Sequence, residues 1–207
     1  MTSLVGQTVV HLFAKKNIDV VLTRKKDIYL SLDERTHIAN TCNKADLFIS
    51  IHANGSQKQD ACGIETFFLD HQLLKKALIV SQALHKSDRL KGINTLLDVS
   101  QDRASDSSIF KKVLKERSDQ SKMLAHLLQE NMLAQVRKKN KSVVDRKVKS
   151  AVTQVLLGVT IPAALIEVGF LTNKYEAALL NTEEYRFLLA DGIVSAVCSY
   201  LKSIKSF

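Results

Sequence analysis

Short runs of apolar residues recur along the chain, separated by longer stretches in which apolar residues have helical spacing. The runs that predict strands are at residues 18–22, 47–51, 64–69 and 163–168. An apolar run of this length is typical of a strand that is buried on both faces of a mainly parallel sheet. Strands that alternate with helices predict an α/β fold.

Helices are predicted where apolar residues recur every three or four positions. The expected helices are at residues 4–15, 32–42, 73 to about 87, 109 to about 138, and in two closing segments after Asn173 and Asn181. Ser31 and Glu34 have the spacing of a capping box at the start of the second helix. No Gly/Ser-rich linker or internal repeat divides the 207 residues. We therefore expect a single domain with a mostly parallel sheet flanked by helices.

Two of the predicted strands carry a residue that can take part in catalysis. His52 follows the first of these runs directly, and Glu167 interrupts the other. Ligands of open α/β sheets bind at the carboxyl ends of the strands, where a histidine could be a metal ligand and a glutamate a general base. A histidine that caps a strand and a glutamate that pairs with an arginine are structural alternatives, and spacing alone leaves them open.

The chain has a formal net charge of +9, and its basic residues are unevenly distributed. Two basic clusters lie at residues 137–141 and 146–149. Neither contains interleaved aromatic residues or belongs to a recognisable binding module, so nucleic acid is not the expected partner. We favour a solvated helix end, with an anionic cell-envelope surface as the functional alternative. The three cysteines, Cys42, Cys62 and Cys198, show no paired spacing and are expected to be free thiols.

Five parts of the chain resemble, in the same order, motifs of one enzyme family. Two of them are Phe-Ile-Ser-Ile-His-Ala-Asn at residues 48–54 and Leu-Ile-Glu-Val-Gly-Phe-Leu-Thr-Asn at residues 165–173. The others are at residues 21–24 with 31–40, 63–69 and 145–151. The family is that of the zinc-dependent N-acetylmuramoyl-L-alanine amidases of the Amidase_3 type. The resemblance implies one amidase-like catalytic domain over residues 1–207, with a weakly matching helical insert at about 71–142.

The resemblance implies a peptidoglycan hydrolase that uses a zinc-activated water to cleave the amide between N-acetylmuramic acid and L-alanine. His52 matches a zinc ligand, Glu167 matches the general base, and Asn54 is expected to shape the loop that follows His52. The family's other two ligands lie in an Asp-Pro-Gly-His-Gly-type segment and in a glutamate that opens the first helix. Neither matches any part of these 207 residues. The chain is therefore expected to be N-terminally truncated relative to the family, and weak or inactive alone.

The same resemblance implies peptidoglycan or a muropeptide as the partner, an activator protein, and a place in the periplasm or cell envelope. The chain as given shows neither an export signal nor a transmembrane segment. One alternative is a catalytically inactive homologue that serves as a peptidoglycan-binding or regulatory module. The other is an unrelated basic α/β protein that binds nucleic acid. The presence of both His52 and Glu167 favours an enzyme, and the ordered motifs disfavour a nucleic-acid-binding protein.

Overall fold

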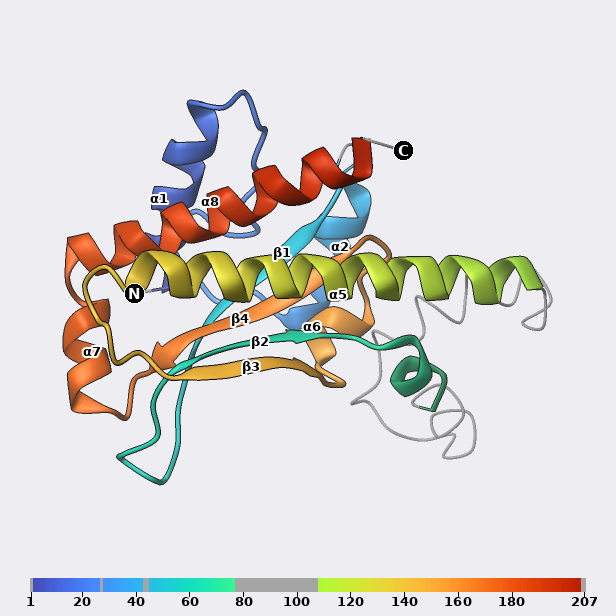
Figure 1. Ribbon diagram of the computed structural model, residues 1–207. Coiled ribbons are helices and arrows are strands. Elements are labelled where there is room, and N and C mark those ends of the chain that lie inside the picture. The colour runs from blue at the N-terminus through green and yellow to red at the C-terminus, as the bar shows by residue number, and fades with distance from the viewer. Residues whose placement is uncertain (1, 27, 43–44, 77–107, 206–207) are drawn as a thin grey trace.

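The computed structural model describes residues 2–26, 28–42, 45–76 and 108–205, which are built around a four-stranded sheet (Figure 1). The strands are β1 (Phe48–Asn54), β2 (Ile64–Phe68), β3 (Asp145–Ser150) and β4 (Ala163–Phe170), in the spatial order β1-β4-β2-β3. β1 runs parallel to β4 and β2 runs parallel to β3, whereas β2 and β4 are antiparallel. The α/β class with flanking helices is confirmed, and the sheet is mixed.

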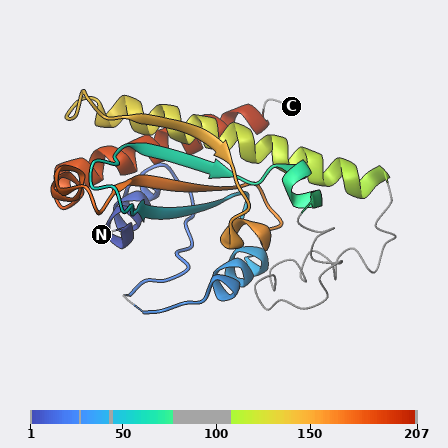
Figure 2. The ribbon, with the colours of Figure 1, turned by 90° about the horizontal axis from the view of Figure 1, so that it is seen from below.

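Helices lie on both faces of this sheet (Figure 2). α5 (Ser108–Val136) and α8 (Glu183–Lys205) lie side by side over one face, and α1 (Thr2–Ala14) packs against α8 beside β1. α2 (Leu32–Thr41) and the short α6 (Gln154–Leu157) lie on the other face. α7 (Lys174–Leu180) follows β4 and leads into α8.

The larger core lies between the sheet and helices α5 and α8. Ile64 of β2 and Ile166 of β4 point into it, together with Leu128 of α5 and Ile193 of α8. By length and composition α8 could cross a membrane, but it contributes many buried side chains to this core. In this fold α8 is therefore the central helix of a packed layer.

The face of the sheet toward α2 and α6 changes character along its strands. Phe48, Phe67 and Leu165 pack into a second apolar core with the short helix α6. Successive side chains of a strand point to opposite faces, so every second residue returns to this face. Beyond the apolar positions, the residues that return are polar and include His52 and Glu167. One face of the sheet thus has an apolar half and a polar half.

Most predicted elements are present with small shifts at their ends. The helix expected at residues 109–138 is the unbroken α5, and the strand expected at 47–51 is β1, which extends to Asn54. Asn173 caps α7 as expected, because its side-chain oxygen accepts hydrogen bonds from the backbone N–H groups of Tyr175 and Glu176. The helix expected at 73–87 is described only up to Lys76.

The prediction of a strand at residues 18–22 is wrong. These residues have no regular secondary structure, although their apolar pattern is that of a strand. They line a groove of about 670 Å³ that also borders the free edge of β1. A strand is defined by backbone hydrogen bonds to a neighbour, and no neighbouring strand among the described residues reaches this segment. The apolar pattern therefore indicates that this segment is partly buried, but it does not indicate that the segment pairs with another strand.

Candidate functional site

His52 and Glu167 lie directly opposite each other on the parallel strands β1 and β4. Directly paired residues point to the same face of a sheet, so both side chains belong to its polar half. Each residue is half-buried. The structure thus brings together the two residues that the sequence singles out, in the arrangement expected of a shared site.

A third ionisable residue, Glu65, extends this pair into a row across three strands. Glu65 pairs with Glu167 across the antiparallel strands β2 and β4. Neighbouring strands lie about 4.8 Å apart, so the two carboxyl groups are close neighbours on one face. Glu65 is not among the site residues that the sequence predicts. The signal that could have found it is a single acid inside an otherwise apolar strand.

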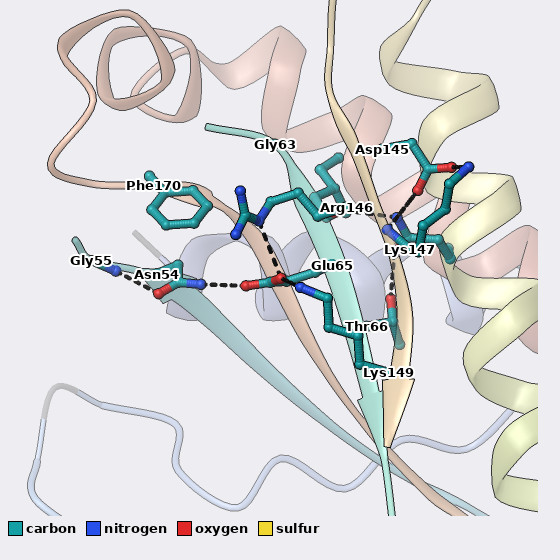
Figure 3. Close-up of polar contacts among 12 residues, drawn as sticks. Asn54, Gly55, Gly63, Glu65, Thr66, Asp145, Arg146, Lys147, Lys149 and Phe170 are labelled. Atoms are coloured by element: carbon teal, nitrogen blue, oxygen red, sulfur yellow. Dashed lines mark hydrogen bonds and ion pairs between the residues drawn. The ribbon is translucent and has the colours of Figure 1, made fainter. Parts of the chain in front are cut away.

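Glu65 is only 4% exposed, and three side chains donate hydrogen bonds to its carboxylate (Figure 3). Asn54 Nδ2 lies 2.6 Å from Oε1, and Arg146 Nε lies 3.1 Å from Oε2. Lys149 Nζ also donates to Oε2. Asn54 in addition accepts a hydrogen bond of 2.8 Å from the backbone N–H of Gly55. Asn54 therefore both shapes the loop after β1, as expected, and fixes the carboxylate of Glu65.

A bulge in β3 brings both cations to Glu65. Strict alternation would send the side chains of Arg146 and Lys149, three residues apart, to opposite faces. The register between β2 and β3 shifts at this point, so that β3 contains one extra residue. Lys147, inside the bulge, has a φ of 72°, which is unusual for a residue with a Cβ. The bulge therefore gives one carboxylate two cationic partners.

Glu167 is the most strongly perturbed acid of this row. Burial, followed by the negative charge of Glu65, raises the pKa of Glu167 to about 7. Its Oε2 atom is buried and has no hydrogen-bond partner among the described residues. A buried oxygen without a partner is costly, and such atoms are often those that a ligand or water meets. Glu167 can therefore exchange a proton near neutral pH.

His52 is held in its neutral form. Burial lowers the pKa of His52, and the positive charges of Arg35 and Arg24 lower it further. Arg24 lies in the segment that joins α1 to α2, and Arg35 lies in α2 itself. A neutral imidazole is the form that binds metal ions.

The described residues do not fit a catalytic zinc site on their own. Such a site normally uses three protein ligands and one water. No group of three or more His, Cys, Asp and Glu side chains that could hold a metal ion is found in the described part of the chain. His52 therefore stays a predicted zinc ligand, and the zinc site that the family resemblance implies stays a prediction.

The remaining histidines do not join this row. His11, His37 and His126 are exposed on α1, α2 and α5. His71 follows β2 and lies beside Asp70, with 3.8 Å between Nδ1 and Oδ2. His85 lies outside the described residues. The three cysteines are free thiols, as expected.

Comparison with known proteins decides the family. Residues 1–199 match the sequence profile described as N-acetylmuramoyl-L-alanine amidase. The chain belongs to this family. The match runs through the whole row of site residues, and it confirms the resemblance inferred from the ordered motifs.

Curated members of the family are similar over most of the chain. The N-acetylmuramoyl-L-alanine amidase AmiA of Escherichia coli K12 is 29% identical over 199 residues, covering 95% of this chain and 65% of AmiA. AmiA of Salmonella typhimurium is 30% identical, covering 88% of this chain and 61% of that protein. The chain thus spans less than two thirds of the length of both relatives.

Solved structures of the family share the fold. An N-acetylmuramoyl-L-alanine amidase from Clostridium difficile 630 superposes with a TM-score of 0.69 at 28% identity, covering 97% of this chain and 82% of that one. The CwlD amidase from Clostridioides difficile superposes with a TM-score of 0.65 at 23% identity, covering 97% and 84% of the two chains.

Proposed function

We propose that this chain is the catalytic part of a peptidoglycan hydrolase that cleaves the amide between N-acetylmuramic acid and L-alanine. The observation that carries the proposal is Glu167, a half-buried acid with an unpartnered oxygen and a pKa of about 7, opposite a neutral His52. A general base works best when its pKa lies near the working pH. Family membership supports the choice of an amide bond as the target.

In this proposal Glu167 moves the protons of the hydrolysis. Its carboxylate takes a proton from the water that attacks the amide carbon, and it returns that proton to the nitrogen of L-alanine as the C–N bond breaks. Glu65 is not the base in this scheme, because three side-chain donors already occupy its carboxylate. Its negative charge adds to the effect of burial in raising the pKa of the neighbouring Glu167.

Zinc is the cofactor that the family resemblance implies, and His52 is the residue of this chain that we expect to bind it. When bound in such a site, zinc polarises the substrate carbonyl and acidifies a water. Because the described residues offer no three-ligand set, the steps proposed here are those of Glu167 alone.

The substrate suggests where the protein works and with what. Peptidoglycan lies outside the cytoplasmic membrane, so we place the protein in the periplasm or cell envelope. The fold neighbour CwlD was solved in complex with the GerS lipoprotein. We likewise predict an activator protein for this chain.

A second candidate is an inactive homologue that binds peptidoglycan without cleaving it. The described residues favour this candidate in one respect, because they supply no set of three metal ligands. The presence of Glu167 with a perturbed pKa favours the enzyme, since binding alone does not require a proton acceptor. A cleavage assay separates the two.

The test is release of L-alanyl peptides from insoluble peptidoglycan, followed by mass spectrometry, with and without added Zn²⁺. We expect weak cleavage by the wild-type chain and a further loss of roughly 100-fold or more in Glu167→Gln, because the substitution removes the base and keeps the shape. The matched control is Glu130→Gln, an exposed acid on α5.

Equal turnover in Glu167→Gln and wild type would show that Glu167 is not the base. Wild-type chain that sediments with peptidoglycan under both conditions but releases no peptide would support the inactive homologue.

A further inference from the structure

A second hollow borders the polar half of the sheet face on the side of β3. It has a volume of about 430 Å³ and lies between the loop after β1, the start of β3 and the end of β4. Arg146 and Phe170 line it from the sheet, and Ser56, Lys58 and Asp60 line it from the loop. The proton transfer proposed for Glu167 uses none of these residues.

Arg146, which borders this hollow, is held between Glu65 and Phe170 (Figure 3). Its Nε donates to Glu65, and its guanidinium carbon lies 5.0 Å from the centre of the Phe170 ring. Its two terminal nitrogens donate to no other described side chain or carbonyl, and in Figure 3 they point away from Glu65, toward Phe170. The side chain is 35% exposed. Arg146 thus presents a fixed pair of N–H donors to the hollow.

Arg146 does not have a carboxylate of its own. Arg146 and Lys149 share the single carboxylate of Glu65. On the loop side, Lys58 and Asp60 carry opposite charges. A planar guanidinium whose two terminal nitrogens have no partner among the described residues, and which shares its anion with a second cation, is the kind of group that binds a carboxylate in a bidentate manner.

The strained bulge of β3 is what brings both cations to this carboxylate. With regular alternation, only one of the two cations would reach the face of Glu65. One cation would suffice to neutralise Glu65, so the unusual backbone of Lys147 gives the site a second positive charge. Residues other than glycine in such backbone conformations cluster at functional sites.

We propose that Arg146 and the hollow beside it form a subsite for a carboxylate on the peptide side of the scissile amide. This inference rests on the proposed amidase function. The muramic acid side has no free carboxylate to offer, because its carboxyl group is the acyl part of the amide. The peptide side ends in a carboxylate.

The position of the guanidinium fits such a subsite. It lies against Phe170, three residues beyond Glu167 on β4, which corresponds to roughly 10 Å along the strand. An extended peptide spans about 3.4 Å per residue. A carboxylate two or three residues beyond the amide would therefore reach Arg146 while the amide lies at Glu167.

The test measures binding by calorimetry on the full chain with Glu167→Gln, so that no probe is cleaved. The probes are N-acetylmuramoyl-L-alanyl-glycine and N-acetylmuramoyl-L-alanyl-glycyl-glycine, each as the free acid and as the C-terminal carboxamide. We expect at least one free acid to bind roughly tenfold more tightly than its carboxamide. Adding Arg146→Gln should abolish this preference and leave carboxamide binding unchanged.

The matched control is Lys147→Gln, which removes the same charge from the same strand. Lys147 Nζ pairs with Asp145 at 2.6 Å and not with Glu65, so the preference should persist. If Arg146→Gln proves unfolded by circular dichroism, Arg146→Lys keeps an ion pair with Glu65 but loses the forked donors. It should lose most of the preference.

The outcomes are distinguishable from those of the proposed function. Equal binding of acid and carboxamide by the chain with intact Arg146, or a preference that survives in both Arg146 variants, would overturn the subsite. An acid preference that depends on Arg146, in a chain that cleaves no peptidoglycan, would support the subsite and reject only the amidase activity.

Discussion

The two halves of one sheet face are built from the same strands and yet behave oppositely. In the apolar half, Phe48 and Leu165 pack with the short helix α6. On the same face, His52 lies four residues beyond Phe48 on β1, and Glu167 lies two residues beyond Leu165 on β4. Burial in the apolar half contributes stability, whereas burial in the polar half shifts proton affinities. Partial burial thus has a different consequence where the side chains are ionisable.

The polar half contains a second contrast, between its two acids. Glu65 is almost fully buried but accepts hydrogen bonds from Asn54, Arg146 and Lys149. Glu167 is less buried but has an oxygen without a partner. Burial without a hydrogen-bond donor, together with the charge of Glu65, favours the protonated form of Glu167. The hydrogen-bond partners of the two acids, more than the depth of their burial, therefore distinguish Glu65 from Glu167.

The largest expected effect on stability is in the apolar half. Leu165 is 7% exposed, and Leu165→Ala should lower the free energy of unfolding by about 3 kcal/mol, because it removes buried methyl groups and leaves a cavity. Leu171→Ala is the matched control, since Leu171 is 47% exposed, and it should cost less than about 0.5 kcal/mol. Urea unfolding measures both. Similar losses in the two variants would contradict the assignment of a second core.

A smaller stability effect, with a distinct pH signature, is expected for Glu65→Gln. The loss should be about 1–2 kcal/mol, because Arg146 and Lys149 lose their anion but remain partly hydrated. Removing the charge of Glu65 should also lower the pKa of Glu167. The acid limb of the cleavage profile should then move to lower pH, and a ¹³C NMR titration of Glu167 should show the same shift without any assay of activity.

The control for Glu65→Gln is Glu184→Gln, which breaks an exposed ion pair with Lys139. This variant should change the free energy of unfolding by less than about 1 kcal/mol and leave the titration of Glu167 unchanged. A Glu65→Gln chain with an unshifted Glu167 titration would show that the two acids are not coupled.

The smallest expected effect is the pH dependence that Glu167 adds to stability. Its pKa rises from 4.5 to about 7 on folding, so the folded chain binds this proton more tightly than the unfolded chain does. The resulting stabilisation is fully present below pH 4.5 and is lost as the pH rises through 7. Because Glu167 is only half-buried, we expect about 1 kcal/mol after screening by solvent.

Unfolding of wild type and Glu167→Gln at pH values on either side of this window measures the linkage. The wild-type chain should lose more stability than Glu167→Gln as the pH rises. Parallel pH dependences in the two proteins would show that the pKa of Glu167 is not raised on folding.

Part of this arrangement could be predicted from local sequence. The apolar runs at residues 47–51 and 163–168 are β1 and β4, and the acid and histidine in those motifs are in-register partners. The run at residues 18–22 has the same pattern but forms no strand, because pairing depends on a neighbour that the pattern does not contain. β3 was not expected, because its basic sequence (Asp-Arg-Lys-Val-Lys-Ser) lacks an apolar run. The carboxylate subsite at Arg146 could not be predicted without that strand.

By itself, the sequence determined the α/β class, most helices and strands, and the family, and it predicted the two residues on which the candidate site is built. These features depend on hydrophobic periodicity and on short motifs, which are local in the chain. Only the tertiary structure decided that Glu65 lies beside Glu167, and that Arg146 and Lys149 reach the same carboxylate. Those contacts join residues 81 and 84 positions apart. They depend on strand order, register and one bulge, because these alone determine which distant side chains share a face.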